Sequence, residues 1–200
     1  MVDNNHQKRT TDADVDPLFP ERWSPRSFLS EPLPGNHIQS LFEAARWAPS
    51  CYNEQPWMFI YATSPEDRDR FLGALVEKNR IWAAKAPVLA FALARKRFEE
   101  GGRENRHACF DTGAAWMSLA LQARKIGLYA HAMAGFSQEK AYDILCVSKD
   151  QYDIIAAIAI GKKGDPASLP EELRIRESPN LRKPLSGIAF QSRFPKEKKA

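Results

Sequence analysis

The stretch from Pro49 to Trp57 collects the side chains best suited to holding a ligand. Ser50, Asn53 and Gln55 supply one hydroxyl and two amides, all of which both donate and accept hydrogen bonds. The stretch runs into the apolar segment 58–61, so we expect a polar loop fixed between core elements, where binding groups often lie. The residues alone leave a second interpretation equally open, namely a polar turn capped by Asn53.

A second candidate site lies near the N-terminus, where Arg22, Ser24 and Arg26 alternate along a short stretch. If that stretch is extended, the three side chains point to the same side. Guanidinium groups bind pairs of phosphate oxygens, so the spacing indicates an anion site. The alternative is a set of surface arginines in salt bridges, which contribute little to stability.

Metal and thiol chemistry is not expected from this sequence. Cys51, Cys109 and Cys146 follow neither a zinc spacing nor a C-x-x-C pattern, so we expect reduced thiols. Cys109 and Cys146 stand among apolar residues and are predicted to be small core groups, whereas Cys51 lies in the polar loop without an activating partner. The four histidines form no ligand cluster, and no G-x-G-x-x-G motif follows a strand.

Composition and length predict one folded unit with short tails. The chain has 200 residues, 44% of them hydrophobic, which suits a single core. Its net charge of +4 is dispersed, which argues against a nucleic-acid partner. We expect a disordered tail over 1–16, a single domain over 17–195 and a charged tail over 196–200. No apolar run has the length of a membrane span and no signal core is seen, so a cytoplasmic protein without a membrane partner is expected.

The elements that must position these groups alternate without regular βαβ order, which predicts an α+β fold. A helix is expected over 34–48, with an apolar face made by Ile38, Leu41, Phe42, Ala45 and Trp47. Because Gln55 precedes a proline, the polar loop should be extended where it enters the next strand. The other expected elements are strands at 58–63, 88–94, 129–133 and 154–160, helices beginning at Ser64 and Ser137, a short helix around Trp82, a long helix at 107–126, and a loop or frayed helix at 96–106.

The long helix and the C-terminal segment both suggest a second subunit. Helix 107–126 is apolar nearly all round, and such a helix is expected to be buried. In a chain of this size a partner covers one face most easily, and the alternative is a central helix within a monomer. After Lys162 the chain is rich in proline and charge until Leu185, Ile188 and Phe190, so this segment must pack on something.

Four stretches carry a family resemblance. Segment 50–57 has the pattern S-x-x-N-x-Q-P-W, and segment 22–28 has the pattern R-x-S-x-R-x-F. The third is Asp111-Thr112-Gly113-Ala114-Ala115, with segment 127–136 behind the long helix, and the fourth is Arg182-Lys183-Pro184-Leu185. Taken in order along the chain, the four stretches cover roughly residues 18 to 190, and they resemble the nitroreductase family of FMN-dependent oxidoreductases.

The resemblance implies the cofactor site and the fold. The fold would be a mixed, mainly antiparallel sheet flanked by helices, with a long central helix and a C-terminal segment exchanged between the subunits of a homodimer. FMN would be held by Arg22, Trp23, Ser24, Arg26, Pro49, Ser50, Cys51, Asn53, His131, Ala132, Met133, Ala134, Gly135, Arg182 and Lys183. The loop contacts would come from the other subunit, and Phe98 and Phe110 would line the substrate pocket.

Within that set, no side chain is expected to act as a catalytic nucleophile, since the flavin itself carries the chemistry. The backbone N–H of Ala134 would face flavin N5, where some family members have an acidic residue. His131 keeps two interpretations, a contact to the ribityl chain or O2 of the flavin, or a partly buried structural histidine. Hydride would pass from NADH or NADPH through N5 to a nitroaromatic, a quinone or an activated alkene by a ping-pong mechanism. The alternative is a flavin protein of the same fold without NAD(P)H turnover, or with a specialised reductive role.

Overall fold

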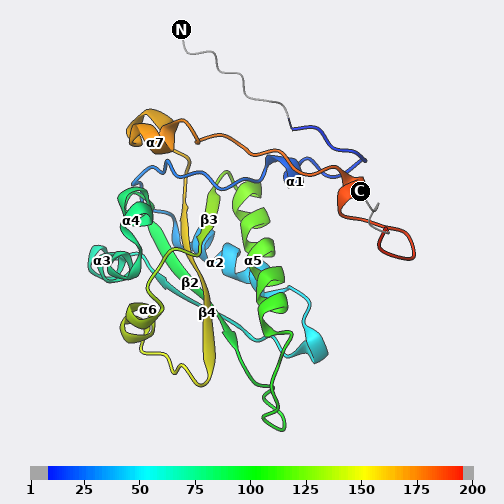
Figure 1. Ribbon diagram of the computed structural model, residues 1–200. Coiled ribbons are helices and arrows are strands. Elements are labelled where there is room, and N and C mark those ends of the chain that lie inside the picture. The colour runs from blue at the N-terminus through cyan, green and yellow to red at the C-terminus, as the bar shows by residue number, and fades with distance from the viewer. Residues whose placement is uncertain (1–8, 196–200) are drawn as a thin grey trace, which may run out of the picture.

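The computed structural model describes residues 9–195, which fold around a four-stranded sheet in the order β1-β2-β4-β3 (Figure 1). The strands are β1 (Trp57–Ala62), β2 (Val88–Arg95), β3 (Tyr129–Met133) and β4 (Tyr152–Gly161). All three pairings are antiparallel, and β2 shifts its register against β4 between Ala92 and Leu93. Within the described residues β1 and β3 are the edges of the sheet.

Helices cover both faces of this sheet, so β2, one of its two central strands, is buried on both sides. Leu89 and Phe91 of β2 join one core cluster, whereas Ala90 and Ala92 join the other, as the two-residue period of a strand requires. The first cluster packs under α3 (Pro65–Ala74), α4 (Glu77–Ala83) and α6 (Gln138–Leu145), and the second under α2 (Gly35–Arg46) and α5 (Ala108–Lys125). The predicted α+β fold is confirmed.

Shorter elements connect these layers. The short helices are α1 (Leu18–Glu21) and α7 (Glu171–Arg174), and single 3-10 turns lie at Cys51–Asn53, Pro166–Ser168 and Leu185–Gly187. Ser64 and Ser137 cap α3 and α6, each accepting a hydrogen bond from a backbone N–H three residues later. Residues 178–195, which we call the C-terminal arm, extend away from the sheet (Figure 1).

The long helix α5 is buried on one side only. Ala115, Leu119 and Ala123 face the core, whereas Phe110 is 80% exposed and Gly113 lies open to solvent. Large apolar side chains of the C-terminal arm are also exposed, among them Leu185, Ile188, Phe190 and Phe194. A single chain therefore leaves uncovered two of the apolar surfaces that the sequence expects to be buried.

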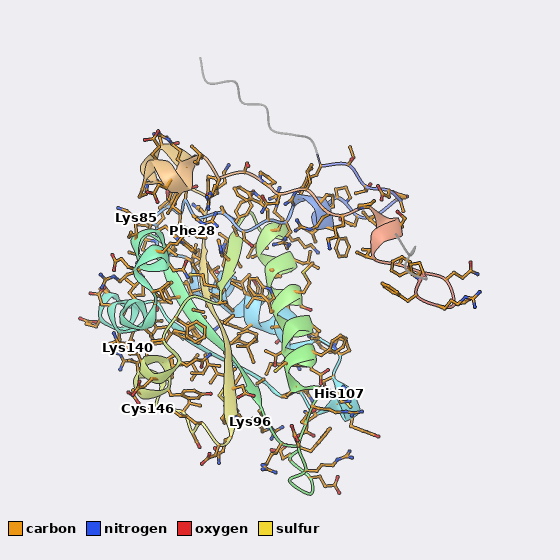
Figure 2. All side chains as sticks on the ribbon, in the orientation of Figure 1. Phe28, Lys85, Lys96, His107, Lys140 and Cys146 are labelled. Atoms are coloured by element: carbon orange, nitrogen blue, oxygen red, sulfur yellow. The ribbon has the colours of Figure 1, made fainter. Side chains whose placement is uncertain are left out.

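Four local expectations are wrong. Cys109 and Cys146 are exposed, because Cys109 lies in the first turn of α5 on the side away from the core and Cys146 follows the last residue of α6, as Figure 2 shows for Cys146. Trp47 is 74% exposed, with its indole N–H donated to Glu43 and the Arg46 guanidinium over its ring. Gln55 is left-handed rather than extended, because its N–H donates to the Ser50 hydroxyl and its side-chain amide to the Asn53 carbonyl.

The predicted tails lie mostly beyond the described residues. Residues 1–8 and 196–200 fall outside them, so the charged tail and half of the expected disordered tail stay predictions, as does the domain boundary at 17. Residues 9–16 form no helix or strand but do make contacts. The Leu185 N–H of the C-terminal arm donates to an Asp12 carboxylate oxygen at 2.7 Å.

Candidate functional site

The site residues expected from the sequence, joined by neighbours that the structure adds (Arg9, Arg103 and Asp111), fall into two groups at opposite ends of α5. The arginine group consists of Arg9, Arg22, Ser24, Arg26, His131 and Arg182. The loop group consists of residues 49–55 with Asp111, Phe98 and Arg103. Figure 2 labels His107, just before α5, at the lower end of that helix, and Phe28, just after the arginine stretch, in the upper part of the molecule.

The arginines gather without carboxylate partners. The Arg22 Nη1 lies 3.5 Å from the Ser24 hydroxyl, so these two side chains share a side as the alternation predicted. Within residues 9–195, none of Arg9, Arg22, Arg26 and Arg182 forms a salt bridge. Burial, and then the positive charge of Arg182, lower the pKa of Arg22 from its ordinary value. The salt-bridge alternative is therefore not what the structure shows, and the cluster suits an anion.

Glu177 fixes the backbone of the arginine stretch. Its Oε1 accepts hydrogen bonds from the Arg26 N–H at 2.8 Å, the Ser27 N–H at 2.8 Å and the Ser27 hydroxyl at 2.9 Å. The carboxylate is only 5% exposed and comes from a segment 150 residues away in sequence. The turn at Arg26 is thus held by a charged acceptor that no local motif in the sequence indicates.

His131 is held below the arginines by its neighbours. Its Nδ1 lies 2.8 Å from the Pro25 carbonyl, so this nitrogen carries the proton and Nε2 is an acceptor. Its ring lies 4.6 Å from the Trp82 ring, centroid to centroid. Burial lowers the pKa of His131, although the bond to Pro25 opposes that change, so the ring is neutral near pH 7. A neutral acceptor suits a ribityl hydroxyl rather than the O2 oxygen of a flavin.

The end of β3 lies beside this histidine. Ala132 is half-buried, Met133 is buried in the core and Ala134 is exposed just past the strand. The Gly135 carbonyl accepts from the Val76 N–H and the Asn79 side-chain amide at 3.1 and 3.0 Å. A Cβ at Gly135 would lie 2.6 Å from that amide, so the glycine is required by close packing on α4. Trp23 packs edge-on against Tyr129.

The loop group is tied to the first turn of α5. The Cys51 N–H donates to the Asp111 carboxylate at 3.0 Å, and Asp111 is 3% exposed. An acidic side chain in the first turn is also favoured by the helix dipole. Asp111 belongs to the quoted sequence motif, yet its contact with the loop was not foreseen. Within the loop, the Ser50 hydroxyl is occupied by the Gln55 N–H.

The loop also holds an unusual backbone conformation. Tyr52, Asn53 and Gln55 all have positive φ, of 54°, 57° and 50°. Left-handed geometry is costly for residues other than glycine and often accompanies a binding role. The asparagine side chain and the 82%-exposed Tyr52 ring remain on the surface. Pro49 is exposed at the start of the loop.

A short hairpin-like loop, segment 96–106, packs against the exposed Tyr52 ring of the loop group. Arg97 and Glu104 form an isolated antiparallel bridge, so segment 96–106 is neither a helix nor unstructured over that part. The Arg103 guanidinium lies 4.4 Å from the Phe98 ring centroid and 5.6 Å from that of Tyr52. Phe98 is buried beneath them, whereas Phe110 is exposed on α5. An aromatic and cationic surface thus adjoins the polar loop.

One chain does not bring the two groups together. Asp111, which holds the loop, lies in the first turn of α5, and Arg124, in the last turn, pairs with Glu21 next to the arginine stretch. The 18 residues of α5 separate its ends by about 27 Å. A ligand that uses both groups therefore needs two chains.

Other candidate features lie elsewhere. An open hollow of about 610 Å³ is bordered by residues of α2 and by Tyr61 of β1, none of which belongs to either group. Across the described chain, no set of His, Cys, Asp and Glu side chains is grouped to hold a metal. No helix in residues 9–195 has both the length and the apolar character to cross a membrane.

Comparison with known proteins shows which proteins this chain resembles in sequence and fold. The sequence model described as "Nitroreductase family" matches residues 20–81 and 75–162. A solved structure of an oxidoreductase containing FMN is 41% identical, covers 94% of this chain and 96% of its own, and superposes with a TM-score of 0.89. A Streptomyces coelicolor protein, provisionally named an NADH dehydrogenase/NAD(P)H nitroreductase, is 28% identical over 182 residues, or 82% of this chain and 92% of that protein. A provisionally named nitroreductase of Exiguobacterium sibiricum, solved with FMN, shares the fold at 19% identity and a TM-score of 0.71, with 92% of this chain and 99% of that one covered.

Proposed function

The chain belongs to the nitroreductase family, and we propose that it is a homodimeric FMN-dependent oxidoreductase acting in the cytoplasm. Its electron donor would be NADH or NADPH and its acceptor a nitroaromatic, a quinone or an activated alkene. The observation that carries this proposal is the arginine group without carboxylate partners, in a chain 41% identical to an oxidoreductase that contains FMN.

The residues present fit the phosphate of FMN. Arg22 is half-buried and the nearby charge of Arg182 repels it, so a phosphate dianion there would relieve an unfavourable arrangement. The Nε of Arg9 is buried and has no hydrogen-bond partner among residues 9–195. Arg22, Arg26, Arg182 and Lys183 would bind the phosphate, Ser24 and the His131 Nε2 the ribityl hydroxyls, and the end of β3 the ring.

Bound FMN would supply the hydride chemistry, with NAD(P)H and the acceptor using the same site in turn, which gives ping-pong kinetics. The protein would bind and orient the cofactor and the two substrates, and it would exclude water from them. The Ala134 N–H, at the exposed end of β3, would provide a fixed donor to flavin N5. Neutral His131 adds no positive charge beside the arginines, so it orients a hydroxyl without competing for the phosphate.

A homodimer follows from the separation of the two groups. In a two-fold symmetric dimer, if residue i of one protomer contacts residue j of the other, then j of the first also contacts i of the second. Two α5 helices packed antiparallel across such an interface would therefore set the loop group of one protomer beside the arginine group of the other. The exposed Phe110 and Gly113 would then be covered. The apolar residues of the C-terminal arm would pack on the partner, and obligate interfaces of this kind bury more than about 2,000 Å².

The acceptor class follows from the loop group. The Tyr52 and Phe98 rings pack edge to face, with the Arg103 guanidinium near both. The exposed Tyr52 ring would stack on an aromatic or quinoid acceptor, and Arg103 would donate hydrogen bonds to its nitro or carbonyl oxygens. Phe110 is positioned on α5, near the same end of the molecule.

The function is tested on the purified protein with both nicotinamides. We expect bound FMN in the absorbance spectrum, bleaching of the flavin bands by NADH or NADPH in anaerobic stopped flow, and return of colour on adding an acceptor. Flavin that neither nicotinamide reduces would favour a flavin protein without NAD(P)H turnover. Protein that binds no FMN in titration would contradict the proposal itself.

The phosphate site makes a specific prediction at Arg26. Each hydrogen bond to a charged group contributes about 1.5–3 kcal/mol, so Arg26→Ala should weaken FMN binding about ten- to a hundredfold. Fluorescence titration of the apoprotein measures this, and riboflavin, which lacks the phosphate, serves as the matched ligand. Unchanged FMN affinity in Arg26→Ala would remove this residue from the site.

A further inference from the structure

Residues 9–16 lie outside the segments that match the family, which begin at residue 20, yet they contact both arginine-bearing stretches. The sequence suggests no role for them. In Figure 1 this part of the chain, drawn in dark blue, runs beside the C-terminal arm to the right of the upper end of α5. The contacts of Arg9 and Asp12 explain that arrangement.

Arg9 uses one end of its guanidinium to hold the backbone of the arginine stretch. Its Nη1 donates to the Pro20 carbonyl at 2.7 Å and to the Arg22 carbonyl at 3.0 Å. The Nε is buried and has no partner, and no bond from Nη2 is found within residues 9–195. Nε and Nη2 form one edge of the guanidinium, which is the edge that grips two oxygens of a phosphate. A buried donor without an acceptor is costly, so this edge lacks a partner that an anion would supply.

Asp12 connects the same segment to the other arginine-bearing stretch. Its carboxylate accepts from the Leu185 N–H at 2.7 Å, just beyond Arg182 and Lys183. Burial first, and then the charges of Arg182 and Arg22, lower the pKa of Arg9, so the three guanidinium groups lie within electrostatic reach of one another. A dianion among them would relieve this repulsion, which a neutral ligand would not do.

We propose that Arg9 is an additional phosphate-binding residue of the FMN site, with its Nε–Nη2 edge directed to the phosphate and Asp12 holding Arg182 and Lys183 nearby. This inference rests on the proposed function. It gives residues 9–16, which precede the segments that match the family, a role in binding the cofactor.

The test compares FMN with riboflavin on the apoprotein of Arg9→Ala, by quenching of flavin fluorescence. Loss of a charged bidentate contact should raise the Kd for FMN about tenfold or more, whereas the Kd for riboflavin should stay within about twofold. Arg9→Lys is the matched variant, because its ammonium reaches nearly as far as Nη1 and can donate to the Pro20 and Arg22 carbonyls, but it has no Nε–Nη2 edge. It should lose FMN affinity as well and keep the melting temperature of the parent protein.

Each outcome decides between specific alternatives. FMN affinity unchanged in both variants, beside a parent protein that binds FMN, would overturn the inference and leave the proposed function intact. Equal weakening of FMN and riboflavin would also overturn it, because that pattern indicates only a lost backbone clamp. A parent protein that binds neither flavin would overturn the proposed function and the inference together.

Discussion

Removal of residues 178–200 is expected to abolish both dimer formation and FMN retention. The deletion takes away Arg182 and Lys183 from the arginine group and the exposed apolar residues of the C-terminal arm, including Ile188 and Phe190. It leaves Glu177 in place, so the turn at Arg26 keeps its acceptor. In the proposed homodimer each FMN site uses the arginine group of one protomer and the loop group of the other, which lie at opposite ends of α5 in one chain, so a monomer would hold only half of each site.

The measurement is sedimentation together with flavin titration. The truncated chain should sediment as a monomer at micromolar concentration and lose more than about a hundredfold in FMN affinity, the combined effect of at least one charged contact and the missing partner loop. Two full-length variants separate the causes. Arg182→Ala with Lys183→Ala should stay dimeric and bind FMN weakly, whereas Ile188→Ser with Phe190→Ser should dissociate at low concentration. A truncated dimer that retains FMN would contradict both the arm exchange and the cross-subunit site.

The sequence predicted the structure correctly where the spacing of apolar residues or a short local motif determines it. Strand β2 and helix α5 end within two residues of their predicted bounds, because a continuous apolar run and a long small-residue pattern leave few alternatives. The alternation of Arg22 and Ser24 correctly placed their side chains together. These inferences need only neighbours along the chain.

The errors arose where a side-chain contact, or the side of a helix that faces the core, decided the outcome against the local sequence pattern. Gln55 is left-handed because the Ser50 hydroxyl captures its N–H, which outweighs the local preference before a proline. Cys109 has apolar neighbours in sequence but points away from the core on α5, so neighbours along the chain gave the wrong burial. Glu177 and Arg9 act on the arginine stretch from outside any motif. The unexpected residues therefore position the motif residues and are found only in three dimensions.

Glu177 is the strongest example of such a positioning residue, and replacing it is expected to have a large effect. One carboxylate oxygen accepts three hydrogen bonds from Arg26 and Ser27, and Ser27 is buried. The other oxygen is buried without a partner among the described residues, so removing the side chain also removes one unfavourable group. The loss of three hydrogen bonds to a carboxylate, which leaves two N–H groups without an acceptor, costs more than removal of the unpartnered oxygen gains. We therefore expect Glu177→Ala to lower the free energy of unfolding by about 2–5 kcal/mol.

The same substitution should weaken FMN binding, because the backbone that carries Arg26 loses its fixed turn. Glu177→Gln is the matched control, since its amide oxygen still accepts from both N–H groups and its amide nitrogen replaces the unpartnered oxygen with a donor. It should lose less than half as much stability as Glu177→Ala in urea unfolding of the apoprotein. If the alanine variant unfolds at the parent's urea midpoint, the three hydrogen bonds add no net stability. If instead stability falls while FMN affinity is kept, Glu177 supports the fold alone, and the arginine turn does not depend on it.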